Sequence, residues 1–117
     1  LVGGEVAALE GEHVVAAARA GDGGASAVLD EFAWWLALGI ANLVNTLDPE
    51  LVLIGGGLAD ESDLFLARTR DELGRMVLGA SARSMTRVDV ATLGSRAGAV
   101  GAALLAAAAV ERGSSPR

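Results

Sequence analysis

The sequence contains no cysteine, no lysine and no tyrosine, and its nine basic residues are all arginine. Without cysteine, disulfides, thiolate nucleophiles and cysteine metal sites are excluded. Without lysine, a phosphate-binding loop of the GxxxxGK type and Schiff-base chemistry are excluded as well. The single histidine, His13, cannot by itself form a zinc site or complete a catalytic triad. Few of the usual catalytic groups therefore remain.

Aromatic residues make up only 3% of the chain although 52% of it is hydrophobic, so its core must be built mainly from Ala, Val and Leu. At 117 residues the chain has the size of one domain. A domain of this size buries roughly 65% of its unfolded surface, which predicts a single core. The net charge of −6 argues against a nucleic-acid surface, because phosphate contacts need clustered positive charge.

Two apolar runs, 34–47 and 97–110, raise the question of a membrane. Each is shorter than the roughly 20 residues that a crossing helix needs, so both are interpreted as buried helices. No basic and apolar leader opens the sequence. We therefore expect no membrane partner, and we expect the cytoplasm as the compartment.

Residues 1–11 show no clear hydrophobic periodicity, and they are expected to form an irregular lead-in. The stretch 12–20 favours a short helix, and Gly21 fits the left-handed position just past its end. At the other end, the tail 112–117 is expected to be disordered. One subdomain over 12–111 lies between them.

A long helix is predicted over 25–47, with Asp22 or Ser26 at its start. From Phe32 onward it is apolar on nearly every side, which places it at the centre of the fold. Pro49 ends it, because the residue before a proline is pushed out of helical geometry.

Two strands are predicted, separated by an amphipathic helix over 60–80. Residues 51–54 form a continuous apolar run, as in a parallel strand buried on both faces. In residues 87–94, apolar and other side chains alternate, which suggests a half-exposed strand nearer a sheet edge. Ser95 is then a plausible cap of a last helix over 96–111. Because two strands make a marginal sheet, further strands are expected in residues 1–10 or outside this chain.

The segments GIANLVNTLDPELVLIGGGLAD and LGSRAGAVGAALLA resemble, in order and spacing, the C-terminal part of ROK proteins. These are bacterial sugar kinases and sugar-responsive transcriptional repressors of the actin-like ATPase superfamily. The resemblance covers roughly residues 12–110. It implies an α/β fold, a partial actin-like ATPase (ribonuclease H-like) C-terminal lobe, rich in helix, with at least two parallel strands at about 51–55 and 87–92.

In the kinases of that family, the glycines that match Gly55, Gly56 and Gly57 lie beside the adenosine of ATP. The resemblance therefore implies cofactor-binding residues at these glycines and Leu58, with ATP and Mg²⁺ as cofactors of the intact protein. Glycine also lets the backbone approach a ligand closely at the carboxyl end of a parallel strand. Alternatively, the glycines bind no ligand and form only a flexible turn between the strand and the next helix.

Several family motifs are not found in these 117 residues. They are the phosphate-binding glycine loop, the catalytic aspartate, the glutamate-glycine-histidine sugar motif and the cysteine-rich zinc motif. We therefore expect no catalytic and no metal-binding residue here, and an inactive chain when it is alone. For His13, Asn42, Asn45 and Asp48 structural roles are favoured. The arginines at 68, 70 and 75 are interpreted as a solvated face.

Three functions remain open. In the first, the chain is the C-terminal, ATP-side portion of a ROK sugar kinase that phosphorylates a hexose such as glucose. Nucleotide and sugar are then partners of the intact protein. Alternatively, it is the effector-binding and dimerisation portion of a ROK repressor, or a non-catalytic interaction module. In each case a homo-oligomer is expected, because an incomplete sheet and an apolar helix expose apolar surface.

Overall fold

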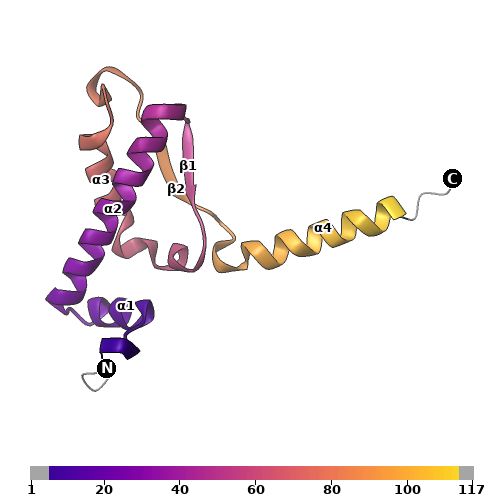
Figure 1. The fold of residues 1–117 in the computed structure, drawn as a ribbon, viewed down its shortest axis with the longest axis horizontal. Coiled ribbons are helices and arrows are strands. Elements are labelled where there is room, and N and C mark those ends of the chain that lie inside the picture. Colours follow the sequence, from indigo (N-terminus) through magenta and orange to yellow (C-terminus); the bar gives the residue numbers. More distant parts are fainter. Residues whose placement is uncertain (1–5, 114–117) are drawn as a thin grey trace.

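The computed structural model describes residues 6–113; parts of the lead-in and the tail, residues 1–5 and 114–117, lie outside the described residues. Helices and strands alternate along most of the chain (Figure 1). Their bounds are α1 (Gly11–Arg19), α2 (Gly23–Leu47), β1 (Leu51–Ile54), α3 (Leu66–Met76), β2 (Arg87–Val90) and α4 (Ala97–Gly113). Within the described residues, the short 3-10 helices are η1 (Val6–Ala8), η2 (Gly57–Leu64), η3 (Ala80–Ala82) and η4 (Gly94–Arg96).

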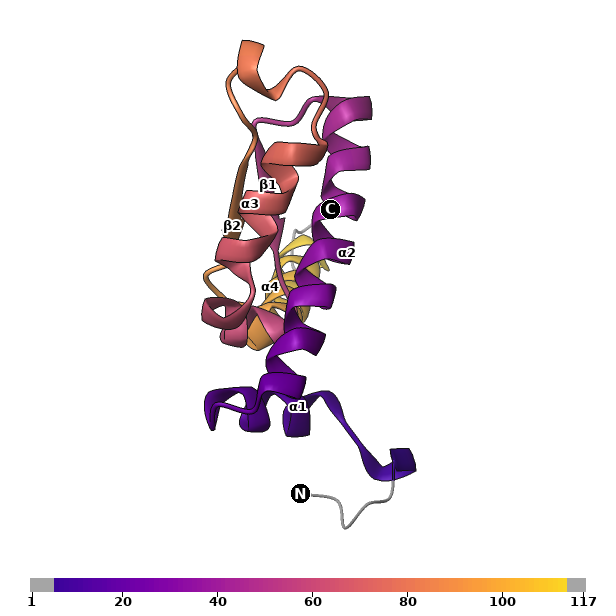
Figure 2. The same ribbon diagram turned by 90° about the vertical axis from the view of Figure 1, so that its left-hand side faces the viewer.

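Strands β1 and β2 form a parallel pair in which Leu51 lies opposite Arg87 and Ile54 lies opposite Val90. At the end of the ladder, the Ala91 N–H donates to the Ile54 carbonyl over 2.8 Å. Helix α3 connects the two strands and packs on the same face of the sheet as α2 (Figure 2). The prediction of at least two parallel strands is therefore confirmed.

The core lies between this face and the two helices. Its buried members are Ala37, Ile40, Ala41, Val44, Leu73, Val77 and Val88. The opposite face of β1 is open, and Leu53 keeps 57% of its surface exposed. The expectation that residues 51–54 are buried on both faces is thus wrong for this chain, because none of the described helices covers the second face.

Helix α2 begins at Asp22, whose Oδ1 accepts a hydrogen bond from the Ala25 N–H over 2.8 Å. It ends at Leu47, and Asp48 then takes the left-handed conformation with φ 46° before Pro49. The helix is long and apolar enough, by length and composition alone, to cross a membrane. Only one of its sides is buried, whereas Trp35 is 58% exposed on another. The predicted central helix is therefore covered on one side only.

The single helix expected over 60–80 is broken in two. Glu61 leaves helical geometry (φ −107°, ψ 18°) inside η2, and Phe65 does so (φ −136°) before α3 begins. Phe65 is 1% exposed and meets the ring of Phe32 edge-to-face, with the centroids 5.1 Å apart. The break thus places a large aromatic side chain in the core.

Arg70 is 48% exposed, as the interpretation of a solvated face implies, and it also bonds to β2. Its Nε and Nη2 donate to the Val88 carbonyl over 2.9 and 2.7 Å, and it pairs with Asp89. The Asp89 carboxylate in turn accepts from the Val90 N–H over 3.0 Å. These bonds engage the Val88 carbonyl and the Val90 N–H on the outer edge of β2.

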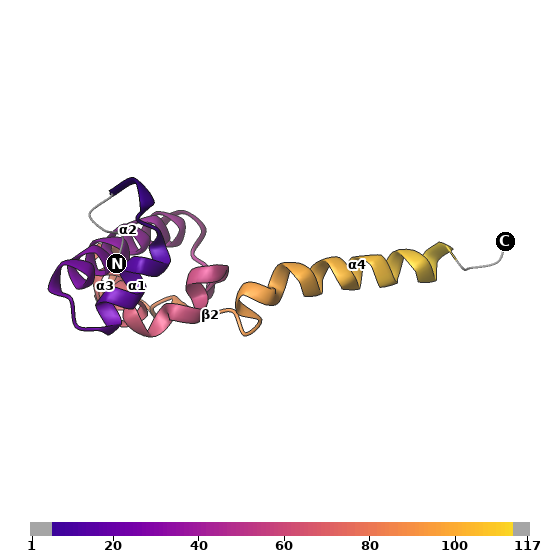
Figure 3. The ribbon, with the colours of Figure 1, turned by 90° about the horizontal axis from the view of Figure 1, so that it is seen from below.

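Helix α4 extends away from the other elements (Figures 1 and 3). Ser95, the expected cap, lies inside η4, and the helix begins at Ala97. Leu104 and Leu105 are 66% and 70% exposed, so the apolar surface of α4 is largely uncovered.

Candidate functional site

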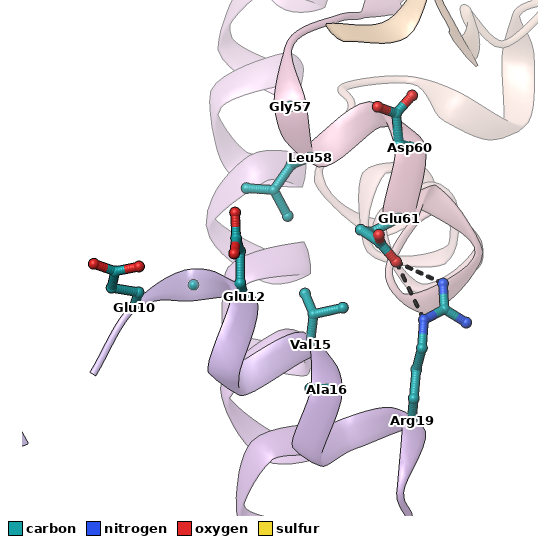
Figure 4. Close-up of a pocket in the computed structure, with 10 residues that line it drawn as sticks. Glu10, Glu12, Val15, Ala16, Arg19, Gly57, Leu58, Asp60 and Glu61 are labelled. Atoms are coloured by element: carbon teal, nitrogen blue, oxygen red, sulfur yellow. Dashed lines mark hydrogen bonds and ion pairs between the residues drawn. The ribbon is translucent and has the colours of Figure 1, made fainter. Parts of the chain in front are cut away.

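A cleft of about 760 Å³ lies between α1 and η2, just beyond the carboxyl end of β1 (Figure 4). Its lining consists of Glu10, Gly11, Glu12, Val15, Ala16, Arg19, Gly57, Leu58, Asp60 and Glu61. The carboxyl end of a parallel strand is where α/β sheets commonly bind ligands. This cleft is the candidate site.

The three glycines connect β1 to this cleft. Gly56 has φ 92° and ψ −173°, a region of backbone conformation that is open essentially to glycine alone. Its carbonyl accepts from the Ala59 N–H over 3.1 Å, which starts the first turn of η2. Of the four predicted residues, Gly57 and Leu58 line the cleft, whereas Gly55 and Gly56 shape the turn that leads to it.

Leu58 faces Val15 of α1 across the cleft in Figure 4. Together with Ala16, these side chains provide an apolar patch between the two walls. An aromatic ring of a ligand would lose contact with water there, which favours binding in proportion to the apolar area covered.

The α1 wall was not predicted from the sequence. Residues Glu10 and Gly11 belong to the expected irregular lead-in, yet they line the cleft. The Glu10 N–H donates to His13 Nδ1 over 3.0 Å, so His13 stabilises the start of α1. An acidic residue in the first turn, Glu12, also suits the positive end of the helix dipole. These capping residues could have predicted where α1 begins, but they do not predict that α1 lies beside η2.

Arg19 closes one end of the cleft by binding two carboxylates of η2. Its Nη2 lies 2.6 Å from Glu61 Oε2 and 2.9 Å from Asp63 Oδ1, and its Nη1 lies 3.0 Å from Asp63 Oδ2. We call these contacts the Arg19 bridge. The hydrogen bonds from Arg19 lower the pKa of the Asp63 carboxyl. The hydrogen bonds that Arg19 donates to Asp63, followed by those that it donates to Glu61, raise the pKa of the Arg19 guanidinium.

Because the Arg19 charge is already bound to two carboxylates, the lining of the cleft is negative. Glu10 and Glu12 add further carboxylates from the side of α1. A phosphate group would be repelled by them, whereas hydroxyl and amino groups could donate hydrogen bonds to them. The cleft therefore suits an uncharged ring with donor groups better than an anion.

Gly94 supports the η2 wall from behind. It is buried, with φ +50°, and a Cβ at this position would overlap the carboxylate of Asp60. In Figure 4 the Asp60 carboxylate points away from α1, in keeping with this contact. The turn after β2 thus fixes where η2 lies.

A second cavity of about 500 Å³ lies at the opposite end of the strands. Arg83 pairs there with Asp48, and the Thr86 hydroxyl donates to the Pro49 carbonyl over 2.8 Å. Asn45 Oδ1 accepts from the Leu78 N–H over 3.0 Å, which ties α2 to the end of α3. The structural roles expected for Asp48 and Asn45 are therefore observed.

Comparison with known proteins finds sequence relatives that are sugar kinases. Over 98 residues, 84% of this chain, the sequence is 42% identical to a glucokinase of Streptomyces coelicolor and covers 31% of it. Over 97 residues it is 32% identical to an N-acetyl-D-glucosamine kinase of Escherichia fergusonii, covering 83% of this chain and 31% of that enzyme.

A solved relative is similar in both sequence and structure. The crystal structure of a ROK family glucokinase from Streptomyces griseus, in complex with glucose and AMPPNP, matches with a TM-score of 0.80 and 40% identity. The match covers 87% of this chain and 33% of that one, so the chain spans about a third of the relatives' length. The predicted fold, part of an actin-like ATPase, is confirmed. Residues 1–109 match the ROK family profile, and the chain therefore belongs to the ROK family.

Proposed function

We propose that the chain is the C-terminal, ATP-side portion of a ROK sugar kinase, which phosphorylates a hexose such as glucose with ATP in the intact protein. The cleft beside Gly57 and Leu58, at the carboxyl end of β1, is the observation that carries this proposal. The chain would provide one wall of the adenosine site. The catalytic base and the phosphate-binding loop would come from the remainder of the protein.

The relatives support a kinase over a repressor. Two of them are named glucokinase and N-acetyl-D-glucosamine kinase, and a solved relative holds glucose together with AMPPNP. Because ATP supplies the phosphoryl group of such a reaction, the cytoplasm is the matching compartment. The groups that bind and recognise the sugar hydroxyls would lie outside the α1–η2 cleft.

The lining of the cleft fits the nucleoside end of ATP. The bare backbone at Gly57 leaves room for close approach, and Leu58 with Val15 would contact the adenine ring. Glu12 could accept hydrogen bonds from ribose hydroxyls. The phosphates and their Mg²⁺ would face away from these carboxylates, toward groups supplied by the rest of the protein.

Adenosine is expected to bind this chain more tightly than ATP does in the absence of Mg²⁺, by about tenfold at low ionic strength. The physical reason is repulsion between the phosphates and the carboxylates of the cleft. Titrations followed by NMR chemical shifts would measure both dissociation constants and show which residues respond.

Leu58→Ala is expected to weaken adenosine binding, whereas Leu53→Ala is the matched control. Leu53 is similarly exposed but lies on the open face of β1. Tighter binding of ATP than of adenosine would contradict the nucleoside assignment. Equal losses in both variants would contradict the place of the site.

We infer that the chain forms homo-oligomers through its uncovered apolar surface. Leu104 and Leu105 on α4 and Trp35 on α2 are all more than half exposed. Large apolar patches of this kind usually mark interaction surfaces. Sedimentation velocity should show a concentration-dependent increase in mass, which Leu104→Glu with Leu105→Glu should reduce. A monodisperse monomer up to about 100 μM, which excludes self-association with a dissociation constant well below that concentration, would contradict the inference.

A further inference from the structure

Arg19 provides the polar connection between the two walls of the cleft. Within residues 6–113, every hydrogen bond and ion pair between α1 and η2 involves its guanidinium. It is the last residue of α1, and Glu61 and Asp63 lie in η2 on the opposite wall. Figure 4 shows the guanidinium crossing from α1 to η2 at one end of the cleft.

We propose that Arg19 is a positioning residue: it sets the width of the cleft by holding η2 against the C-terminal end of α1. This inference rests on the proposed function, because the cleft is taken to receive adenosine. It assigns to Arg19 no contact with the phosphates and no part in phosphoryl transfer.

Both walls join the rest of the fold through short connections that contain a left-handed glycine or a kink. After Arg19 the chain turns through Gly21, with φ 86°, before α2 begins. On the other side, Glu61 sits at the kink inside η2, and Gly56 precedes that helix with φ 92°. Because both connections pass through backbone that is not held in a regular helix, contacts across the cleft add to the packing of η2 on Gly94 in setting the angle between the walls.

The geometry of the bridge requires an arginine. Its planar guanidinium donates from Nη1 and Nη2 to the two oxygens of Asp63 and from Nε and Nη2 to Glu61. A lysine ammonium carries its donors on one nitrogen and cannot reproduce this fork. Lysine would therefore keep the charge and lose part of the fixed separation.

Because the Arg19 bridge is exposed to solvent, its strength should depend on the salt concentration. The side chains of Arg19, Glu61 and Asp63 are 47%, 34% and 60% exposed, so dissolved salt screens the pairs. Adenosine carries no charge. The difference in salt dependence between the native chain and an Arg19 variant then reports the Arg19 bridge, because the effect of salt on apolar contacts is common to both.

A pH dependence with a definite sign also follows. The pKa of Asp63 is lowered by Arg19, so the bridge is complete at neutral pH and above. The contacts with Asp63 are weakened when the pH falls through the lowered pKa of Asp63. The separation of the two walls should therefore become less restricted in acid for the native chain, and Asp63→Asn should remove the part of that change that comes from this carboxyl.

The width of the cleft is testable without any ligand. The chain has no cysteine, so two spin labels can be attached to cysteines introduced at Glu12 and Leu58, one on each wall. The distribution of label distances should be narrow with Arg19 and clearly broader with Arg19→Gln. Arg75→Gln is the matched control, since it removes an equally charged exposed side chain at the far end of α3. An unchanged distribution in Arg19→Gln would overturn the proposal.

Adenosine titration then connects the width to binding. Arg19→Gln should weaken adenosine binding about fivefold at low salt, because two exposed ion pairs are lost, with a smaller loss for Arg19→Lys. High salt should weaken the native chain and leave Arg19→Gln nearly unchanged. Asp63→Asn carries the same test if Arg19→Gln does not fold. A failure of the native chain to bind adenosine would defeat the proposed function, whereas equal affinity and equal salt dependence in all variants would defeat the role of Arg19 alone.

Discussion

Phe65→Ala is expected to lower the free energy of unfolding by about 3–5 kcal/mol, the usual cost of removing a buried phenylalanine. The side chain is 1% exposed, and its ring meets that of Phe32 edge-to-face. It also lies at the junction where η2 ends and α3 begins. Since small domains are stable by only about 5–15 kcal/mol, this variant should be largely unfolded at moderate urea concentrations. Urea denaturation followed by circular dichroism measures the loss.

Two controls separate the cavity from other effects. Phe65→Leu keeps most of the volume and should lose about half as much. Leu104→Ala removes an exposed apolar side chain of α4 and should change the free energy of unfolding by less than about 0.5 kcal/mol. A loss below about 1 kcal/mol for Phe65→Ala would show that the core between α2 and η2 is not formed as described.

The elements that the sequence predicts well are those set by chemistry close in the chain. Asp22 caps α2 with its own side chain, and Pro49 prevents the helix from continuing past Asp48. The apolar run 51–54 and the alternation from Arg87 give two strands whose parallel pairing follows from the helix between them. In each case the determining residues lie within a few positions of the element that they define.

The features that the sequence does not predict depend on residues far apart. Arg19 and Asp63 are 44 positions apart, and nothing in either local pattern shows that they meet. The break at Glu61 and Phe65 follows from burying one ring against Phe32, which overrides the helical period. For the same reason the α1 wall of the cleft escaped prediction, although Gly57 and Leu58 on the other wall were assigned to the site from the family resemblance.

Three glycines near the cleft differ in what a methyl group would meet, and this allows a graded prediction. At Gly55 the added Cβ would lie 3.7 Å from the Ala91 Cβ, an ordinary contact, and its φ is not positive. At Gly56 the added Cβ would meet nothing within 4 Å, but φ is +92°. At Gly94 φ is +50° and the Cβ would also overlap the Asp60 carboxylate. Replacement by alanine should therefore cost nothing at Gly55, cause backbone strain alone at Gly56, and cause strain together with steric overlap at Gly94.

Gly94→Ala is accordingly expected to cost most, about 2–5 kcal/mol of unfolding free energy, from left-handed strain together with overpacking. Gly56→Ala should cost about 1–3 kcal/mol and Gly55→Ala less than about 0.5 kcal/mol. Combining Gly94→Ala with Asp60→Ala removes the overlap, so the double variant should recover about 1–3 kcal/mol relative to additivity. Because Asp60 also lines the cleft, Gly94→Ala should displace η2 and weaken adenosine binding as well. If Gly55→Ala proved as damaging as Gly94→Ala, the close approach of η4 to η2 would not be what positions this wall.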